Sequence, residues 1–481
     1  MVLDKPESSC CVSGSSKAKI RIMVIGAGSA GFSAAITAAE AGADVTLVGE
    51  GTIGGTCVNV GCVPSKTMIR AVEILYQAPH AARFHGITSS ASVLDWQAVV
   101  AHKQQLVEDL RQAKYSDVLS AYPNIRYMEG RAQLGKDGVM VDGKLHTPDK
   151  IIIATGSSNR VPSILGIETI DYLDSTSALG LETLPGSMII IGGGVIGCEL
   201  GQMFARAGVK VTLCCRSRLL PDMEPEISKA LQTYLESEGI TVCAGIGYQS
   251  VKQHGDGVRL HCKNEGKARM LEADRILLAA GRKPNTAGLG LEEAGVLLTK
   301  NGGIEVDAFM RSSNPDIYAA GDVTGKDMFV YMAAYGAKLA AQNAVGGDAQ
   351  SYNNATMPSV VFTDPQVSSV GLTESQASEQ GYSVKTSVIT LDHVPRYLAA
   401  RDTRGLIKLV ADKDTDKLLG AHVLAPEGGE LIQTAAIALK ASMTATELGQ
   451  TIFPYLTGVE GLKLAAQTFD KDVNTLSCCA G

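Results

Sequence analysis

A glycine fingerprint between a predicted strand and a predicted helix occurs twice in this chain of 481 residues. The first copy, GAGSAG, follows the β-rich run KIRIMVI and opens the helical run FSAAITAAEAG; the second, GGGVIG, stands between SMIII and CELGQMFARAG. The fingerprint glycines are Gly26, Gly28 and Gly31, then Gly192, Gly194 and Gly197. The first glycine of each copy permits a tight turn, the second lets a pyrophosphate approach the backbone, and the third lets the helix pack on the strand. The sequence therefore predicts two dinucleotide-binding units.

Segments outside these units also have interpretable patterns. Residues 60–118 are typical of helices, and 122–153 of a short β-meander. From about residue 357, antiparallel strand patterns follow one another until a helical segment begins near 430. We therefore predict an α/β fold with two Rossmann-like dinucleotide-binding domains and a C-terminal domain of α+β type. The predicted divisions are a flexible leader at 1–19, a first nucleotide-binding domain at 20–155 and 285–355, a second at 156–284, and a C-terminal domain at 356–481.

Charge and hydropathy exclude several classes of protein. The formal net charge of −7 provides no basic surface for nucleic acid or for an anionic membrane. No apolar run approaches the ~18–20 residues that span a bilayer. Residues 1–19 lack the apolar core of a secretory signal. We therefore expect a cytoplasmic protein with no membrane and no nucleic-acid partner.

The second strand of each unit ends in residues that bear on the nucleotide ribose. A carboxylate at this place hydrogen-bonds a free 2′-hydroxyl, whereas arginine complements a 2′-phosphate. In the first unit that strand ends at Gly49, with Glu50 one place later. In the second unit it ends in two cysteines followed by Arg216-Ser-Arg218, without a carboxylate. We interpret the arginines as a preference for NADPH over NAD; a solvated basic turn is the alternative.

Residues 54–66 read GGTCVNVGCVPSK and contain two cysteines five positions apart. Cys57 and Cys62 can close a small disulfide ring if the first turn of a helix begins between them. The helix N-terminus and Lys66 would both lower a thiol pKa and hold a thiolate ready. The two leading glycines permit a flat cofactor to approach the backbone. The alternative, two buried cysteines on one helix face, is disfavoured by those glycines and by the Pro-Ser-Lys that follows.

This cysteine motif, both fingerprints and the segments ATG, GRKPN and AAGDVTG together resemble the flavoprotein disulfide reductases. That family, the flavoprotein pyridine nucleotide-disulfide oxidoreductases, includes glutathione reductase, lipoamide dehydrogenase and mercuric reductase. The resemblance covers about residues 20–476. It implies a glutathione reductase-like fold in which the first domain binds FAD, the second binds NADPH, and the C-terminal domain joins two subunits into a homodimer.

The resemblance also implies a role for each motif residue. Cys57 matches the interchange thiol, and Cys62 matches the thiol that forms a charge-transfer complex with the flavin. Lys66 matches the lysine beside the flavin ring, and Glu199 matches its ion-pair partner. The residues on FAD positions are Gly26, Gly28, Gly31, Glu50, Thr56, Ala132, Thr155, Gly156 and Asp322. Those on NADPH positions are Gly192, Gly194, Gly197, Arg216 and Arg218, while Arg282 falls on the FAD or the NADPH side.

The C-terminal segment departs from the members that reduce organic disulfides. Those members carry a His-Pro…Glu element whose imidazole protonates the leaving thiol, a task that needs a group titrating near neutral pH. None of the eight histidines of this chain lies beyond His422. Phe453 precedes Pro454, Tyr455 follows it, and Glu460 has lost its histidine partner. Without that acid, thiol exchange with glutathione or lipoamide should be slow.

A thiophilic metal ion needs no imidazole. Soft Hg(II) prefers two thiolates in low, often linear coordination, and the chain carries the adjacent thiols Cys478 and Cys479 near its end. The missing histidine and this terminal pair are similar to the mercury-reducing members of the family. The similarity implies NADPH-dependent reduction of Hg(II) to Hg(0) through FAD and the Cys57/Cys62 pair, as mercury detoxification. It also implies that Cys478 and Cys479 of the partner subunit take Hg(II) from low-molecular-weight thiols and pass it to the redox pair, with Tyr455 lining the site from that subunit.

Other interpretations stay open. An organic-disulfide reductase is one, and a thiol-based metal buffer or redox sensor without turnover is another. The terminal pair could also be incidental thiols on a disordered tail. Cys10 and Cys11 fit a linker remnant better than a metal collector, since no GMTCxxC motif occurs. We expect the remaining cysteines to be buried as small hydrophobic residues: Cys198, Cys214, Cys215, Cys243 and Cys262.

Overall fold

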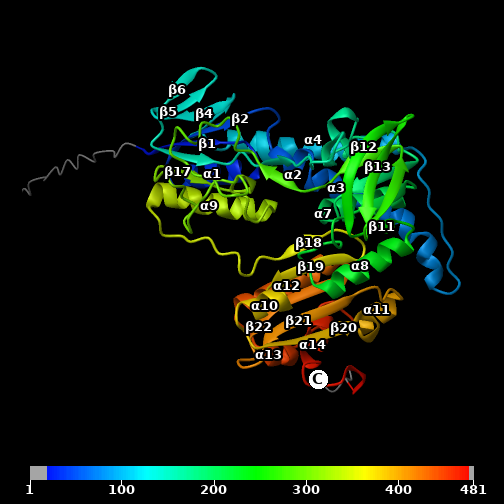
Figure 1. Cartoon of the computed structure of the whole chain (residues 1–481). Helices are drawn as coiled ribbons and strands as arrows, with labels where there is room; N and C mark the ends of the chain where they lie inside the picture. The colour runs from blue at the N-terminus through cyan, green and yellow to red at the C-terminus, as the bar shows by residue number, and fades with distance from the viewer. Residues whose placement is uncertain (1–18, 476–481) are drawn as a thin grey trace, which may run out of the picture. The chain divides into compact units, whose positions relative to one another are not determined.

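The structure is a computed structural model that describes residues 19–475 (Figure 1). It divides into two compact units. The first holds the described residues up to Ile53 together with Asp117–Gly156 and Thr286–Ser351; the second holds Gly54–Ser116, Ser157–Asn285 and the described residues from Tyr352. Residues 54–116 thus group with the second unit, although the sequence prediction kept 20–155 together. The functional domain boundaries stay a prediction.

The first unit is built on a parallel sheet of order β17-β7-β1-β2-β3. Its strands are β1 (Arg21–Ile25), β2 (Asp44–Gly49), β3 (Ile125–Glu129), β7 (Lys150–Ile153) and β17 (Ile317–Ala319). β1 and β7 are almost entirely apolar because both faces of a parallel sheet are buried. The alanine-rich helix α1 (Ser29–Glu40) packs against α9 (Val330–Gly346), as labelled in Figure 1. The carboxyl ends of the five strands share one edge of the sheet.

A smaller antiparallel meander completes the first unit. Its strands are β4 (Ala132–Gly135), β5 (Gly138–Val141) and β6 (Lys144–His146). The sequence predicted one meander over 122–153, and this was wrong at both ends. At those ends, β3 pairs in parallel with β2, and β7 pairs in parallel with β1, so both strands belong to the large sheet and not to the meander.

The second unit contains the second predicted nucleotide fold. Its parallel sheet has the order β11-β10-β9-β15. The strands are β9 (Ser187–Ile191), β10 (Lys210–Cys214), β11 (Thr241–Cys243) and β15 (Arg275–Leu278). The crossovers are helices α7 (Val195–Arg206) and α8 (Pro225–Ser237). One face of the sheet packs on an antiparallel meander of β12 (Ile246–His254), β13 (Gly257–Asn264) and β14 (Lys267–Ala273).

Three helices of the same unit form the cysteine motif and the region packed against it. They are α2 (Gly55–Asn59), α3 (Cys62–Gln77) and α4 (Trp96–Arg111). Helix α3 packs on α7, so the redox motif is attached directly to the second nucleotide fold.

The C-terminal part of the second unit is an antiparallel sheet of order β18-β19-β22-β21-β20. Its strands are β18 (Ser359–Val361), β19 (Gln366–Gly371), β20 (Val384–Thr390), β21 (Leu406–Asp412) and β22 (Leu418–Ala425). Helices α12 (Gly428–Lys440), α13 (Ala445–Gln450) and α14 (Glu460–Gln467) contribute apolar residues to its core. The predicted fold class, with two Rossmann-like folds and an α+β domain, is confirmed. Between residues 19 and 475, no helix is long and apolar enough to cross a membrane.

Candidate active site

The first fingerprint forms a turn that only glycine can make. Gly26 has φ +118°, and a Cβ there would lie 2.2 Å from the Ala154 carbonyl oxygen. A Cβ on Gly31 would lie 1.7 Å from the Gly26 carbonyl oxygen. Helix α1 begins after Gly28, and no side chain caps its N-terminus. This end of the helix therefore fits a phosphate group, as the FAD prediction requires.

Four other predicted FAD residues follow neighbouring strands of the same sheet. Glu50 follows β2, Thr155 and Gly156 follow β7, and Asp322 follows β17. Because the strands are parallel, these residues share the sheet edge with the fingerprint turn. Ala132 is different, since it begins β4 in the small meander and its side chain is buried.

Gly49 explains why the acidic residue stands one place late. A Cβ at Gly49 would lie 2.6 Å from the Ala27 Cβ and 2.8 Å from the Tyr127 hydroxyl. The strand end therefore requires glycine, and the exposed Glu50 is the first position that can carry a carboxylate.

The second fingerprint repeats this geometry. A Cβ on Gly192 would lie 2.1 Å from the Ala279 carbonyl oxygen, and one on Gly197 would lie 1.8 Å from the Gly192 carbonyl oxygen. Around Gly194, in contrast, a Cβ would meet nothing within 4 Å. Gly194 precedes α7, whose N-terminus has no side-chain cap. The open space at Gly194 fits the approach of a dinucleotide phosphate.

The three predicted nucleotide arginines differ in their surroundings. Arg216 is exposed two residues after the end of β10. Arg218 donates from one terminal nitrogen to the carbonyls of Pro221 and Met223, both at 2.7 Å. Its other terminal nitrogen is buried with no hydrogen-bond partner among the described residues, which fits an anion such as a 2′-phosphate. Arg282 holds β16 (Arg282–Pro284) against β8 (Ser157–Asn159) through hydrogen bonds to both ends of β8.

The redox motif brings its two thiols together as predicted. Cys57 lies in α2, and Cys62 is the first residue of α3; both are half-buried free thiols. The Cys57 thiol donates a hydrogen bond to the Cys62 sulfur, and this bond, helped by the Lys66 charge, lowers the pKa of Cys62 to about 7. The same bond, together with burial, raises the pKa of Cys57. The pair is therefore one thiolate and one thiol near neutral pH. Thr56, predicted to contact FAD, is exposed next to Cys57.

A buried ion pair connects this motif to the second nucleotide fold. Lys66, one turn after Cys62 on α3, lies 2.7 Å from the Glu199 carboxylate on α7. The Lys66 side chain is 30% exposed and that of Glu199 only 4%. The second Glu199 oxygen accepts a hydrogen bond from the Phe362 backbone at 2.9 Å, and the Lys66 ammonium lies 4.8 Å from the Phe362 ring centre. Sequence reasoning missed Phe362, because neither its type nor its local sequence marks it.

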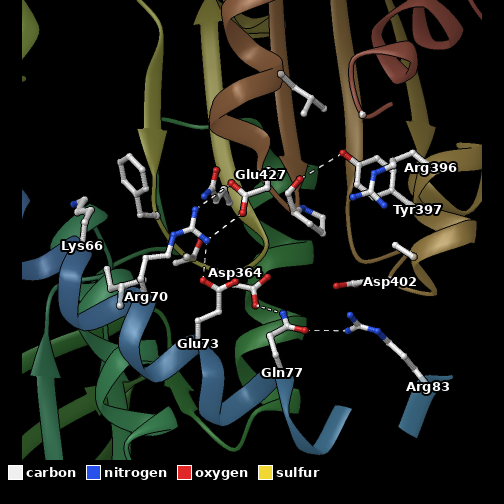
Figure 2. Close-up of a pocket in the computed structure, with 18 residues that line it drawn as sticks. Lys66, Arg70, Glu73, Gln77, Arg83, Asp364, Arg396, Tyr397, Asp402 and Glu427 are labelled. Carbon is white, nitrogen blue, oxygen red and sulfur yellow. Dashed lines mark hydrogen bonds and ion pairs between the residues drawn. The ribbon is translucent and has the colours of Figure 1, made fainter. Parts of the chain in front are cut away.

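Lys66 also borders a pocket of about 390 Å³ (Figure 2). Charges of both signs line it, and Arg70 pairs there with Glu73 at 2.8 Å and with Glu427 at 3.0 Å. Tyr397 is a buried member of the lining. These pairings leave the pocket without a strong net charge on its walls.

The C-terminal segment contains the predicted tyrosine but no catalytic imidazole. Tyr455 is 56% exposed in the loop before α14, and its role toward a partner subunit stays a prediction. Glu460, expected to have lost its partner, accepts a hydrogen bond from the Leu456 backbone at 3.2 Å and so has a structural role. His422, the last histidine, is buried on β22 between Ser369 and the Leu372 carbonyl, and burial lowers its pKa.

The second predicted metal-binding pair, Cys478 and Cys479, lies outside the described residues, as do Cys10 and Cys11. In the described part of the chain, no group of three or more His, Cys, Asp or Glu side chains is arranged to hold a metal ion. Cys57 and Cys62 therefore provide two ligands at most, which suits a two-coordinate ion rather than a tetrahedral one.

Two nucleotide folds and a thiolate–thiol pair define a class, the pyridine nucleotide-dependent oxidoreductases that work through a dithiol. Comparison with family models agrees: residues 20–343 match the pyridine nucleotide-disulphide oxidoreductases, and residues 357–466 match their dimerisation domain. The chain belongs to this family. Membership confirms an oxidoreductase that uses FAD and a pyridine nucleotide, and it confirms the glutathione reductase-like fold.

Curated relatives narrow the resemblance further. The chain is 47% identical to a mercuric reductase of Bacillus cereus, over 95% of this chain and 73% of that protein. It is 46% identical to one of Shigella flexneri, over 97% and 84% of the two chains. With one of Streptomyces lividans it shares 44% identity over 96% and 98%. The resemblance to mercuric reductases that the sequence motifs indicated is confirmed.

Solved structures resemble the whole fold. The Cu(II) complex of the HOCl-induced flavoprotein disulfide reductase RclA from Escherichia coli matches with a TM-score of 0.83 and 31% identity, over 94% of this chain and 99% of that one. LpdA from Mycobacterium tuberculosis matches with a TM-score of 0.81 and 27% identity, over 93% and 99%.

Proposed function

We propose that this chain catalyses the NADPH-dependent reduction of Hg(II) to Hg(0), and so detoxifies mercury. One observation carries the proposal: a thiolate–thiol pair is ready for a soft metal, while the segment that would hold an acid for organic disulfides has Phe453-Pro454-Tyr455 in place of an imidazole. The identity of 43–47% with proteins named mercuric reductase supports the same substrate.

The cofactors would bind on the two nucleotide folds. FAD, when bound, supplies a two-electron relay between NADPH and the dithiol. The turn at Gly26 and the N-terminus of α1 would hold its pyrophosphate. The open space at Gly194 would receive the NADPH pyrophosphate, and Arg216 with Arg218 would bind the 2′-phosphate.

The dithiol binds and holds the substrate. The Cys62 thiolate displaces one small-molecule thiolate from Hg(II), and Cys57 displaces the second and gives it its proton. Lys66 stabilises the negative sulfur, and Glu199 keeps Lys66 in position. Two electrons from NADPH then convert Hg(II) to Hg(0), with NADP⁺ and one proton as the other products. Neutral mercury leaves because it no longer binds thiolate.

Delivery would come from a second copy of the chain. The dimerisation domain and the exposed apolar residues Ile452 and Tyr455, which are 95% and 56% exposed, support an interface in this region. Cys478 and Cys479 of the partner subunit would take Hg(II) from low-molecular-weight thiols and pass it to Cys57 and Cys62.

A comparison of substrates tests the proposal. NADPH oxidation is followed after addition of Hg(II) as its bis-glutathione complex, of oxidised glutathione, or of oxidised lipoamide. We expect oxidation with Hg(II), release of elemental mercury vapour, and slow oxidation with both disulfides. Rapid turnover of a disulfide with none of Hg(II) would identify an organic-disulfide reductase. Flavin bleaching by NADPH without turnover of any substrate would identify a metal buffer or sensor.

A further inference from the structure

The second nucleotide fold contains five buried cysteines that the proposed reaction does not use. They are Cys198, Cys214, Cys215, Cys243 and Cys262. Burial of all five confirms the sequence prediction. Three of these thiols donate to backbone carbonyls: Cys198 to Gly193 at 3.5 Å, Cys215 to Ser217 at 3.7 Å, and Cys262 to Arg269 at 3.7 Å. Such thiols are satisfied locally and behave as core residues.

Cys214 and Cys243 are free thiols that lie beside each other instead. They are in-register partners at the ends of the parallel strands β10 and β11, so both side chains point to the same face of the sheet. Neighbouring strands lie about 4.8 Å apart, a spacing at which two sulfur atoms can share one ligand. The Cys214 thiol donates its hydrogen bond to the Cys243 sulfur. Both belong to the apolar core between this sheet and the meander of β12 to β14.

The protonation state of Cys214 and Cys243 resembles that of Cys57 and Cys62. The hydrogen bond from Cys214, together with the Arg269 guanidinium, lowers the pKa of Cys243 to about 6. The same bond and burial raise the pKa of Cys214. One sulfur is thus a ready thiolate and the other carries the proton, as in Cys57 and Cys62.

The pair lies close to the surface although it is buried. Cys214 is 0% and Cys243 4% exposed. Cys243 is the last residue of a short edge strand, and the exposed side chain of Arg269 reaches its sulfur. Local opening of an edge strand is a low-energy motion, so an ion has a short path to the pair.

We propose that Cys214 and Cys243 form a second dithiol site, which captures a soft two-coordinate metal ion such as Hg(II) without reducing it. A bis-thiolate complex of Hg(II) loses both small-molecule ligands, and two bonds from Hg(II) to the protein sulfurs replace them. One ligand departs as thiolate, and the other departs as thiol with the Cys214 proton. No electron transfer takes part. The described residues offer no third ligand for an ion of higher coordination.

Mercury retention by the oxidised holoenzyme tests this site. The parent variant carries C10A, C11A, C478A and C479A, and its Cys57–Cys62 pair is kept as the disulfide, without NADPH. The probe is Hg(II) as its bis-glutathione complex, and bound mercury is measured after desalting. We expect one mercury per chain in the parent, loss of that mercury with Cys243→Ser, and retention with the matched control Cys262→Ser. Equal mercury in the Cys243→Ser variant and its parent would overturn the proposal.

A second measurement needs no substitution at the pair. Phenylarsine oxide bridges two close thiols, and peptide mapping of the treated parent identifies which thiols it joins. We expect it to join the peptides that contain Cys214 and Cys243. An arsenical found only elsewhere, or none at all, contradicts the proposal even if Cys243→Ser fails to fold. Because no turnover is measured, neither result depends on whether the chain reduces Hg(II).

Discussion

At the scale of single residues, one hydrogen bond makes two similar cysteines chemically different. Cys57 donates to Cys62, so the proton stays on Cys57 and the pKa of Cys62 falls to about 7. Lys66 adds a positive charge one helical turn away, while Glu199 acts in the opposite direction and raises the pKa of Cys62. A large share of the Cys62 sulfur is therefore thiolate near neutral pH, and the thiolate is the form that binds soft metals.

Replacement of Lys66 should raise the pKa of the reactive thiol. In Lys66→Met the cation is lost and Glu199 is left unpaired, and both changes disfavour a thiolate, so we expect a rise of about one pKa unit. The measurement is the iodoacetamide alkylation rate of the reduced protein between pH 5 and 9. In the unsubstituted protein this rate should fall about tenfold per pH unit below pH 7.

Lys66→Arg is the matched control because it keeps the charge. Its alkylation profile should stay close to that of the unsubstituted protein. If Lys66→Met and Lys66→Arg gave the same profile, the lysine charge would have no part in setting the thiol pKa.

At the scale of elements, two glycines of the second fingerprint should have different roles: Gly197 in folding and Gly194 in NADPH binding. A Cβ on Gly197 would press on the Gly192 carbonyl at 1.8 Å, whereas one on Gly194 would meet open space. Gly197→Ala should therefore displace α7 and lower the free energy of unfolding by about 3 kcal/mol. Gly194→Ala should fold normally but weaken NADPH binding, because its methyl group occupies the space that the phosphate needs. Thermal unfolding and NADPH titration measure the two effects, and tight NADPH binding by Gly194→Ala would exclude this loop as the phosphate site.

The loop before α14 depends on one carboxylate. Glu460 accepts the Leu456 backbone hydrogen bond at 3.2 Å. Glu460→Ala should cost about 1 kcal/mol of stability and speed hydrogen exchange at the Leu456 amide. Glu460→Gln keeps an acceptor oxygen and should stay near the unsubstituted values. Unchanged exchange in Glu460→Ala would mean that the loop is held by other contacts.

At the scale of the whole molecule, delivery of mercury between subunits can be tested by mixing two inactive proteins. One carries Cys478→Ala and Cys479→Ala; the other carries Cys57→Ser and Cys62→Ser. If the partner subunit's tail serves the site, a mixed dimer contains one complete site, and co-expressed chains should recover roughly a quarter of the unsubstituted activity. Tails that serve their own chain would leave the mixture inactive. The assay is Hg(II)-dependent NADPH oxidation by the co-expressed mixture; mixed dimers isolated from it by two different tags should show roughly half of the unsubstituted activity.

The parts of the fold that local sequence determines were predictable. The two fingerprints indicated a strand, a turn and a helix, because each glycine is required by a contact within its own βαβ unit. The cysteine motif and the Lys66–Glu199 pair followed from family resemblance. Contacts between distant segments were not predictable: Phe362 meets Glu199 across 163 positions. Cys214 and Cys243 seemed separate core residues because their pairing depends on the register of two strands.

Helix α7 connects the predicted NADPH site to the redox pair. It begins beside the open space at Gly194, and about one turn later it carries Glu199, which holds Lys66. A rigid rod of this length transmits any displacement of its first turn to that carboxylate. A nucleotide that shifts this turn should therefore change the reactivity of Cys62, and the alkylation rate with and without NADP⁺ measures that change.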